Sequence, residues 1–184
     1  RDKVVKTLIK NGLLIDPANQ VQAYLNLILE DGKVVAVTEE EPEADRVIDA
    51  TGKVVAPGFI DIHMHEDPVK DGKIEFCIFD AMLRMGVTTA VGGNCGINVY
   101  DPVKYLDMVE KDGAPVNVML FAGHQYFREA AGALDKYAPV TKEQQEHMKK
   151  GLEKALEAGC VGISYGLRYV PGTGRDEFLD TASC

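Results

Sequence analysis

Two histidines stand one residue apart in the segment Asp61-Ile62-His63-Met64-His65, at the end of an apolar run. Side chains of an extended segment alternate between two faces, so Asp61, His63 and His65 are expected on the same face. Two imidazoles at the carboxyl end of a parallel strand can converge on one metal ion. This spacing favours a metal site; the structural alternative is that one histidine caps a turn and the other is a hydrogen-bonded polar residue.

A cysteine, Cys95, follows the next apolar run, within Thr88-Thr89-Ala90-Val91-Gly92-Gly93-Asn94-Cys95-Gly96. The glycines allow the backbone to turn tightly directly after a strand. A thiolate is a strong zinc ligand, and a neighbouring metal keeps it deprotonated. A buried structural cysteine is the alternative, but the histidines on the adjacent strand favour the ligand role. Cys77 and Cys160 are expected in the core.

Metal-assisted hydrolysis also requires a carboxylate that takes a proton from water and passes it to the leaving group. Glu66 and Asp67 follow the histidines directly and are the nearest acids in the sequence. We expect them to be solvated loop residues, with a contact to a metal ligand as the alternative. His147 lies in a charged, exposed helix and is not expected to be a ligand.

These residues must be positioned by strands and helices that alternate from Val54 onward. Strands are predicted at 54–62, 87–91, 116–122 and 160–166, and the first of them is expected to be buried on both faces. Helices are predicted at 74–85, 101–113 and 141–159, with a further helix beginning at Asp176. Short connections make the strands parallel. The sequence predicts an α/β fold, either half of an eight-unit barrel or most of an open sheet.

The residues before this alternation are expected to form part of a small β-domain. Alternating or β-branched runs at 4–9, 24–29 and 33–37 predict strands, and Asp31-Gly32 predicts a two-residue hairpin. The predicted domains are therefore residues 1–53 and residues 54–184, the second of them incomplete at its C-terminus.

The composition excludes several classes of partner. The chain has 20 basic and 29 acidic residues, a formal charge of -9, and no run of Lys or Arg longer than two, so neither nucleic acid nor an anionic membrane is expected to bind. Its apolar segments are too short to span a bilayer, and no signal-like segment is present. The four cysteines show no CxxC pair, so no disulfides are expected and the cytoplasm is the predicted compartment. The first residue is not Met and the sequence ends abruptly at Cys184, so we expect a portion of a longer protein.

Four segments resemble one known family. The run VVAPGFIDIHMH resembles the first barrel strand of the amidohydrolase superfamily, and TTAVGGNCGIN resembles the second strand of its N-acyl-D-amino-acid deacylase branch, the D-aminoacylases. Two later segments, GHQYFR from Gly123 and GISYGLRYVPG from Gly162, agree with that branch and follow in its order.

The resemblance implies a small β-sandwich followed by a (β/α)8 TIM barrel, of which this chain holds about the first four units. It implies hydrolysis of N-acyl-D-amino acids by water activated by Zn²⁺, with one or two ions. One zinc is held by Cys95 with two histidines from later strands, and a second by His63 and His65 with a late Asp that is also the general base. Those later residues lie beyond residue 184, so the chain alone is expected to be inactive and to need the C-terminal half of the same protein.

Four residues near the predicted mouth of the barrel are candidates for binding the small-molecule substrate. His124 and Arg128 follow the third predicted strand, and Arg168 and Tyr169 follow the fourth. His124 is equally consistent with stabilisation of a turn. The family usually has an apolar residue where Arg168 stands, so Arg168 is expected either to pair with the carboxylate of an acidic substrate or to lie at the surface.

Two other functions remain open. Cyclic amidohydrolases of the dihydroorotase or hydantoinase type share the β-domain and the histidine pair, but they usually bridge two metals with a carboxylated lysine on the fourth strand. The segment 160–169 contains no lysine, which counts against this function. A non-catalytic, truncated half-barrel is the second alternative, and it would expose unpaired strand edges.

Overall fold

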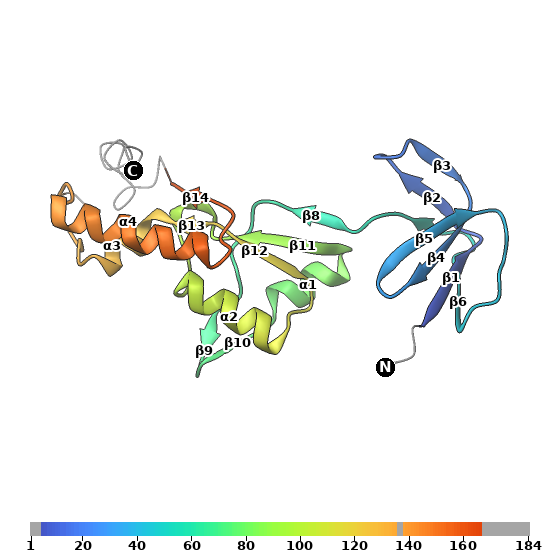
Figure 1. Ribbon diagram of the computed structural model, residues 1–184, viewed down its shortest axis with the longest axis horizontal. Coiled ribbons are helices and arrows are strands. Elements are labelled where there is room, and N and C mark those ends of the chain that lie inside the picture. The colour runs from blue at the N-terminus through green and yellow to red at the C-terminus, as the bar shows by residue number, and fades with distance from the viewer. Residues whose placement is uncertain (1–4, 136–137, 167–184) are drawn as a thin grey trace. The chain divides into compact units, whose positions relative to one another are not determined.

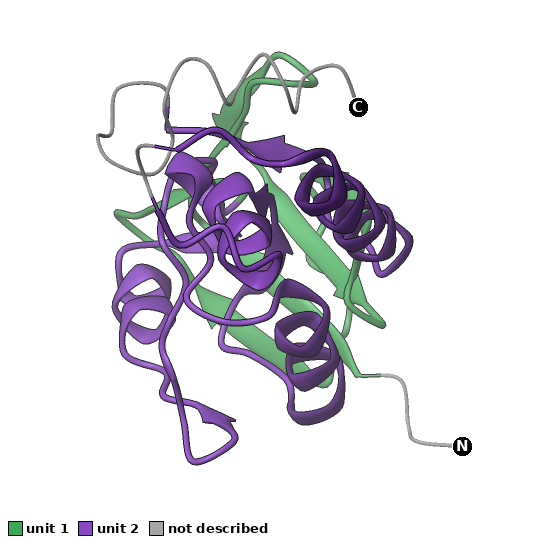
Figure 2. Cartoon of the chain, turned by 90° about the vertical axis from the view of Figure 1, so that its left-hand side faces the viewer, with its two compact units in different colours: residues 1–57 green, residues 58–184 purple. Residues whose placement is uncertain are grey.

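The computed structural model describes residues 5–135 and 138–166 (Figure 1). The chain divides into two compact units, residues 1–57 and 58–184 (Figure 2). The division falls at Pro57-Gly58, a few residues after the predicted boundary. Arg168, Tyr169 and the helix predicted from Asp176 lie outside the described residues.

Unit 1 consists of two small β-sheets. The strands are β1 (Lys6–Lys10), β2 (Leu13–Asp16), β3 (Val21–Tyr24), β4 (Asn26–Glu30), β5 (Lys33–Thr38), β6 (Arg46–Asp49) and β7 (Val54–Val55). They form a four-stranded sheet in the order β5-β4-β1-β6 and a three-stranded sheet in the order β3-β2-β7. The predicted hairpin joins β4 to β5, with φ of 49° at Asp31 and 69° at Gly32, which is the left-handed geometry of a tight two-residue turn.

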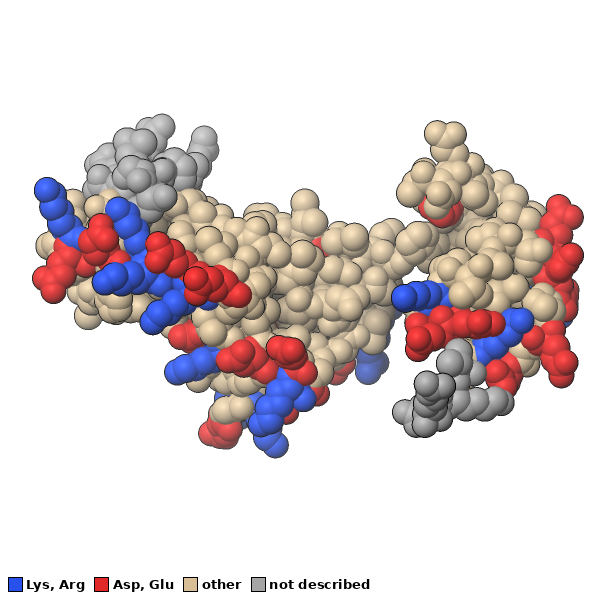
Figure 3. All heavy atoms as spheres, viewed as in Figure 1, with Lys and Arg blue, Asp and Glu red and all other residues tan. Residues whose placement is uncertain are grey.

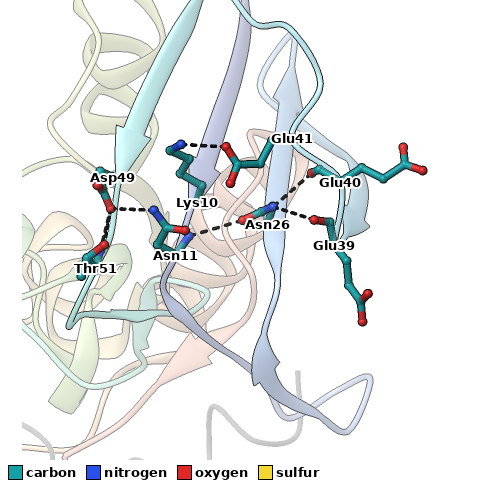
Figure 4. Close-up of polar contacts among 8 residues, drawn as sticks. All are labelled: Lys10, Asn11, Asn26, Glu39, Glu40, Glu41, Asp49 and Thr51. Carbon is teal, nitrogen blue, oxygen red and sulfur yellow. Dashed lines mark hydrogen bonds and ion pairs between the residues drawn. The ribbon is translucent and has the colours of Figure 1, made fainter.

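A buried asparagine organises the polar side of unit 1 (Figure 4). The Asn26 side-chain amide donates to the carbonyl oxygens of Glu39 and Glu40, at 3.2 and 3.0 Å, and its oxygen accepts from the Asn11 N–H. The Asn11 side chain in turn donates to Asp49 at 3.2 Å. Because these bonds satisfy backbone groups of the same unit, we assign the network a structural role.

Unit 2 has mixed α/β structure. Its strands are β8 (Phe59–Asp61), β9 (Val69–Lys70), β10 (Lys73–Ile74), β11 (Val87–Gly92), β12 (Asn117–Leu120), β13 (Ala122–Gly123) and β14 (Ile163–Ser164), and its helices are α1 (Ile78–Arg84), the 3-10 turn η1 (Asn94–Gly96), α2 (Pro102–Asp112), α3 (His124–Ala130) and α4 (Lys142–Glu157). Strands β8, β11 and β12 pair in parallel in the order β12-β11-β8, and β13 pairs in parallel with β14. The main strands and helices follow the predicted order, but the hairpin of β9 and β10 and helix α3 were not predicted. The strand predicted at 54–62 is divided into β7, which pairs with β2 of unit 1, and β8.

Two helices begin where their sequence signals predict. The Asp101 carboxylate accepts from the Lys104 N–H at 3.0 Å, and Pro102 is the first residue of α2. Thr141 and Gln144 form the predicted reciprocal capping box at the start of α4. The residue before helix α3 is Gly123, which has no side chain that could cap the helix. The sequence therefore lacks the capping signal that marks the start of α2 and α4.

The core of unit 2 lies between the strands and the helices. Its fully buried members include Phe79, Tyr105, Leu120 and Ala155. Helix α4 carries lysines and glutamates, and basic and acidic side chains are interspersed over the surface drawn in Figure 3. The Lys149 Nζ lies 3.2 Å from the Glu146 carboxylate. In the part of the chain that the structure describes, no helix is long and apolar enough to cross a bilayer.

Two expectations about burial are wrong. Phe59 and Ile60 of β8 are 68% and 64% exposed, although the first strand was expected to be buried on both faces. The reason is that β8 is an edge strand among the described residues, paired only with β11. Cys77 is exposed rather than in the core, because it lies at the N-terminus of α1, whereas Cys160 is buried as predicted.

Candidate metal centre

The structure brings His63 and Cys95 together. The His63 Nε2 lies 3.3 Å from the Cys95 Sγ, with His63 exposed and Cys95 half-buried. Nitrogen and sulfur ligands of one tetrahedral zinc, at about 2.0 and 2.3 Å from the ion, are themselves roughly 3.5 Å apart. The observed 3.3 Å is close to this separation and is also the length of a hydrogen bond between the two side chains, whereas the resemblance assigns Cys95 and His63 to neighbouring zinc ions.

Cys95 occupies an unusual backbone conformation. In the Cys95 turn, which we define as residues 93–96, φ is 70° at Gly93, 61° at Cys95 and 79° at Gly96. The left-handed region suits glycine, but for cysteine it is uncommon and persists only where the surroundings hold it in place. The contacts of this turn with the rest of unit 2 therefore decide where the thiol points.

Asn94 connects the Cys95 turn to the histidine segment. Its side-chain nitrogen lies 2.7 Å from the carbonyl oxygen of Val91, 3.2 Å from that of Met64 and 3.4 Å from that of Ile62. The last two carbonyls belong to the residues on either side of His63. Asn94 thus fixes the backbone around the histidine relative to the cysteine.

Glu66 holds the Cys95 turn from the other side, and it is not the solvated loop acid that we expected. It is 2% exposed, and its carboxylate accepts from the N–H groups of Gly93 and Val99, at 2.7 and 3.1 Å, and from the Asn98 amide at 3.2 Å. A buried carboxylate with these donors stabilises the loop between β11 and α2.

Asp67 is also buried rather than solvated. Its carboxylate accepts from the N–H groups of Cys77, Ile78 and Phe79, at 3.0, 2.7 and 2.9 Å, and so caps α1. Burial alone raises the pKa of this carboxyl, but these hydrogen bonds outweigh it and hold the pKa below its usual value. The donors lie at least ten residues from Asp67, so no local sequence signal identifies this role.

His65, the third predicted metal ligand, is exposed. Within residues 5–135 and 138–166, no group of three or more His, Cys, Asp or Glu side chains is arranged to hold a metal ion. The described residues therefore place two of the three predicted ligands in contact, and the ligand role of His65 stays a prediction.

His124, the first residue of α3, is buried beside Tyr165. The two ring centroids are 5.2 Å apart, and His124 is 1% exposed. Neither ring nitrogen has a hydrogen-bond partner among the residues that the structure describes. Burial, together with the charge of Arg128, lowers the pKa of His124 to about 4. At neutral pH the imidazole is uncharged, with one nitrogen able to donate a hydrogen bond and the other able to accept one.

Arg128, four residues further along α3, is 2% exposed. Its Nη2 donates to the carbonyl oxygens of Asp135 and Ala138, at 2.5 and 2.8 Å. The guanidinium therefore holds the backbone that follows α3. Substrate binding by Arg128 stays a prediction, as it does for Arg168 and Tyr169, which the structure does not describe.

Comparison with known proteins agrees with the motifs. The family model described as "Amidohydrolase family" matches residues 46–168. The chain is 31% identical over 188 residues to the N-acyl-D-glutamate deacylase of Alcaligenes xylosoxydans xylosoxydans and 30% identical over 188 residues to the D-aminoacylase of the same organism, covering 90% and 89% of this chain and 38% of each relative.

A solved structure is similar over nearly all of the chain. The N-acyl-D-glutamate deacylase of Bordetella bronchiseptica, crystallised with zinc and a phosphonate inhibitor, superposes with a TM-score of 0.82 at 30% identity, covering 98% of this chain and 42% of that protein. The chain thus spans about two fifths of the length of these relatives. The resemblance to the D-aminoacylases is confirmed, and the chain belongs to the amidohydrolase family.

Proposed function

We propose that this chain forms the N-terminal part of a zinc-dependent enzyme that hydrolyses the amide bond of N-acyl-D-amino acids. The observation that carries the proposal is the 3.3 Å contact between His63 Nε2 and Cys95 Sγ, in a chain whose relatives include deacylases of this class. A thiolate and an imidazole at this separation suit zinc better than a hard cation that prefers oxygen.

Cys95, His63 and His65 are the residues that would hold one or two zinc ions. When bound, zinc lowers the pKa of a coordinated water to about 7 and polarises the substrate carbonyl. The protein's own contribution is rigidity, because Asn94 and Glu66 fix the Cys95 turn before any ligand arrives. We place the remaining ligands and the general-base Asp beyond residue 184, where the second half of a (β/α)8 barrel would follow.

This architecture accounts for the exposed apolar side chains of β8. In a closed barrel, β8 would pair on both sides, and Phe59 and Ile60 would be covered. Residues 1–53 would then belong to the β-sandwich domain, and the described strands of unit 2 to the first four barrel units. The cytoplasm remains the predicted compartment.

For substrate binding, we propose His124, Arg128, Arg168 and Tyr169. Both ring nitrogens of neutral His124 lack a hydrogen-bond partner among the described residues, which leaves them able to bond a substrate. Arg168 would pair with the side-chain carboxylate of an N-acyl acidic D-amino acid. In the full-length protein, Arg168→Met should then reduce hydrolysis of N-acyl-D-Glu relative to N-acyl-D-Met; an unchanged ratio would exclude this role.

A cyclic amidohydrolase is the second candidate. One observation counts against it: the fourth strand region, Cys160 to Gly166, includes no lysine that could be carboxylated to bridge two metals. Hydrolysis of dihydroorotate or a hydantoin by the full-length protein, without deacylase activity, would favour this candidate.

The metal-site proposal is tested by measuring zinc content and deacylase activity in Cys95→Ser and His63→Ala variants of the full-length protein. Both variants should lose most of their zinc and their activity. The matched control is Cys77→Ser, because Cys77 is an exposed cysteine whose Sγ donates to Asp67, a bond that serine can keep. Zinc content and activity at the parental level in Cys95→Ser would overturn the proposal.

A further inference from the structure

Ser164 of β14 contacts both sides of the Cys95 turn. Its hydroxyl donates to the carbonyl oxygen of Gly93 and accepts from the N–H of Gly96 at 3.0 Å. These partners precede Ser164 by 71 and 68 residues. One hydroxyl therefore bridges the two ends of a turn in which only Asn94 and Cys95 lie between the bonded groups.

The approach of β14 to this turn depends on a glycine in the neighbouring strand. Gly123 of β13 stands opposite Ser164 in the parallel register. A Cβ at Gly123 would lie 2.8 Å from the backbone of Gly96, closer than real Cβ atoms come to backbone atoms. The Gly123 N–H also donates to the Asn98 side chain at 2.7 Å. The β13–β14 pair therefore packs directly against the Cys95 turn.

We propose that Ser164 is a positioning residue whose hydroxyl holds the Cys95 turn in the backbone conformation that directs Sγ at His63. Asn94 and Glu66 anchor the turn to the histidine segment, and the Ser164 hydroxyl bonds both of its ends. Cys95 has a left-handed φ of 61°, which an unsupported cysteine would leave for a less strained conformation. The metal-ligand part of this inference rests on the proposed function, whereas the effect on the Cys95 thiol does not.

Three variants of the full-length protein test this role. Ser164→Ala removes both hydrogen bonds, and Ser164→Thr keeps the hydroxyl. Thr141→Ala is the control, because the Thr141 hydroxyl also bonds the backbone, but at the start of α4. Thermal unfolding of each variant shows whether any effect on the site merely follows a loss of stability.

The first measurement is alkylation of Cys95 by iodoacetamide after removal of metal with a chelator. Peptide mass mapping follows Cys95, with Cys77 as the internal reference. Ser164→Ala should raise the Cys95 rate by roughly fivefold or more, since the turn opens more often without its two hydrogen bonds. Ser164→Thr should restore the parental rate, and Thr141→Ala should not change it.

The second measurement is titration with Co²⁺, followed by the thiolate-to-cobalt charge-transfer band. Ser164→Ala should bind about 10- to 100-fold more weakly, the usual effect of removing a residue that supports a metal ligand. A parental Cys95 alkylation rate in Ser164→Ala would overturn the positioning role. If the unmodified protein shows no charge-transfer band, the proposed metal centre fails, and the alkylation rates still decide the role of Ser164.

Discussion

Burial of neutral His124 predicts a specific loss of stability in acid. The ordinary pKa of histidine is 6.5, and that of His124 in the folded protein is about 4. Between these values the unfolded chain binds a proton that the folded protein excludes, so the free energy of unfolding falls as the pH falls. The loss amounts to about 1.4 kcal/mol per pH unit and to about 3 kcal/mol between pH 7 and pH 4.

His124→Phe isolates this contribution. Phenylalanine keeps a ring beside Tyr165, where the centroids are now 5.2 Å apart, and it removes the titrating group. At pH 7 the variant also avoids burying two ring nitrogens that have no partner within residues 5–135 and 138–166, so its stability should equal or exceed that of the parent. At pH 4 it should be more stable than the parent by about 3 kcal/mol beyond the difference at pH 7.

Urea unfolding at a series of pH values between 7 and 4 measures this difference. The 184 residues of this chain include no tryptophan, so circular dichroism is the suitable signal. Carboxylates titrate in the same range, and for this reason the comparison is made between variant and parent. His147→Phe, at an exposed position of α4, is the matched control. Curves for parent and His124→Phe that stay parallel from pH 7 to pH 4 would refute the reasoning.

Two further predictions concern the supports of the site. Asp67→Ala leaves three backbone N–H groups at the start of α1 without their carboxylate. The free energy of unfolding, measured in urea at pH 7, should fall by about 3 kcal/mol. In the parent, the Asp67 contribution should persist into acid, because the pKa of Asp67 is lowered, and it should be lost as the pH falls through that pKa. A loss below about 1 kcal/mol would contradict the capping role. Gly123→Ala places a methyl group 2.8 Å from the backbone of Gly96 and should both weaken Co²⁺ binding and lower the melting temperature. Gly132→Ala is the control, because its added carbon meets no described atom within 4 Å, although its φ of 74° disfavours alanine. This control should lower the melting temperature and leave Co²⁺ binding unchanged.

The parts of the fold that the sequence predicted are those with local causes. The caps of α2 and α4 depend on residues within one helical turn, Asp101 with Pro102 and Thr141 with Gln144. The contact between His63 and Cys95 agrees with the expectation that residues following neighbouring parallel strands meet at one edge of the sheet, although β8 ends at Asp61, so that alternation along the strand does not extend to His63. The two caps need only the spacing of a few residues, whereas the contact, between residues 32 positions apart, also needs the parallel pairing of β8 with β11.

The parts that the sequence missed depend on distant partners. Glu66 was predicted to be a solvated loop acid, because its hydrogen-bond donors, the N–H groups of Gly93 and Val99, lie about thirty residues later in the sequence. Helix α3 lacks a capping side chain, and so nothing marked its start at His124. The expected burial of β8 assumed a second neighbouring strand, which the described residues do not include. The burial of Glu66 and the exposure of β8 depend on contacts between segments that are distant in the sequence, and local sequence patterns do not reveal such contacts.

The bond between Gly96 and Ser164 has a consequence for biosynthesis. A ribosome adds about 5–20 residues per second, so the 68 residues that separate this pair take roughly 3 to 14 seconds to make. During that interval the nascent chain presents its thiol without the hydroxyl that later closes around it. The two hydrogen bonds that close the Cys95 turn can therefore form only after β14 has been synthesised.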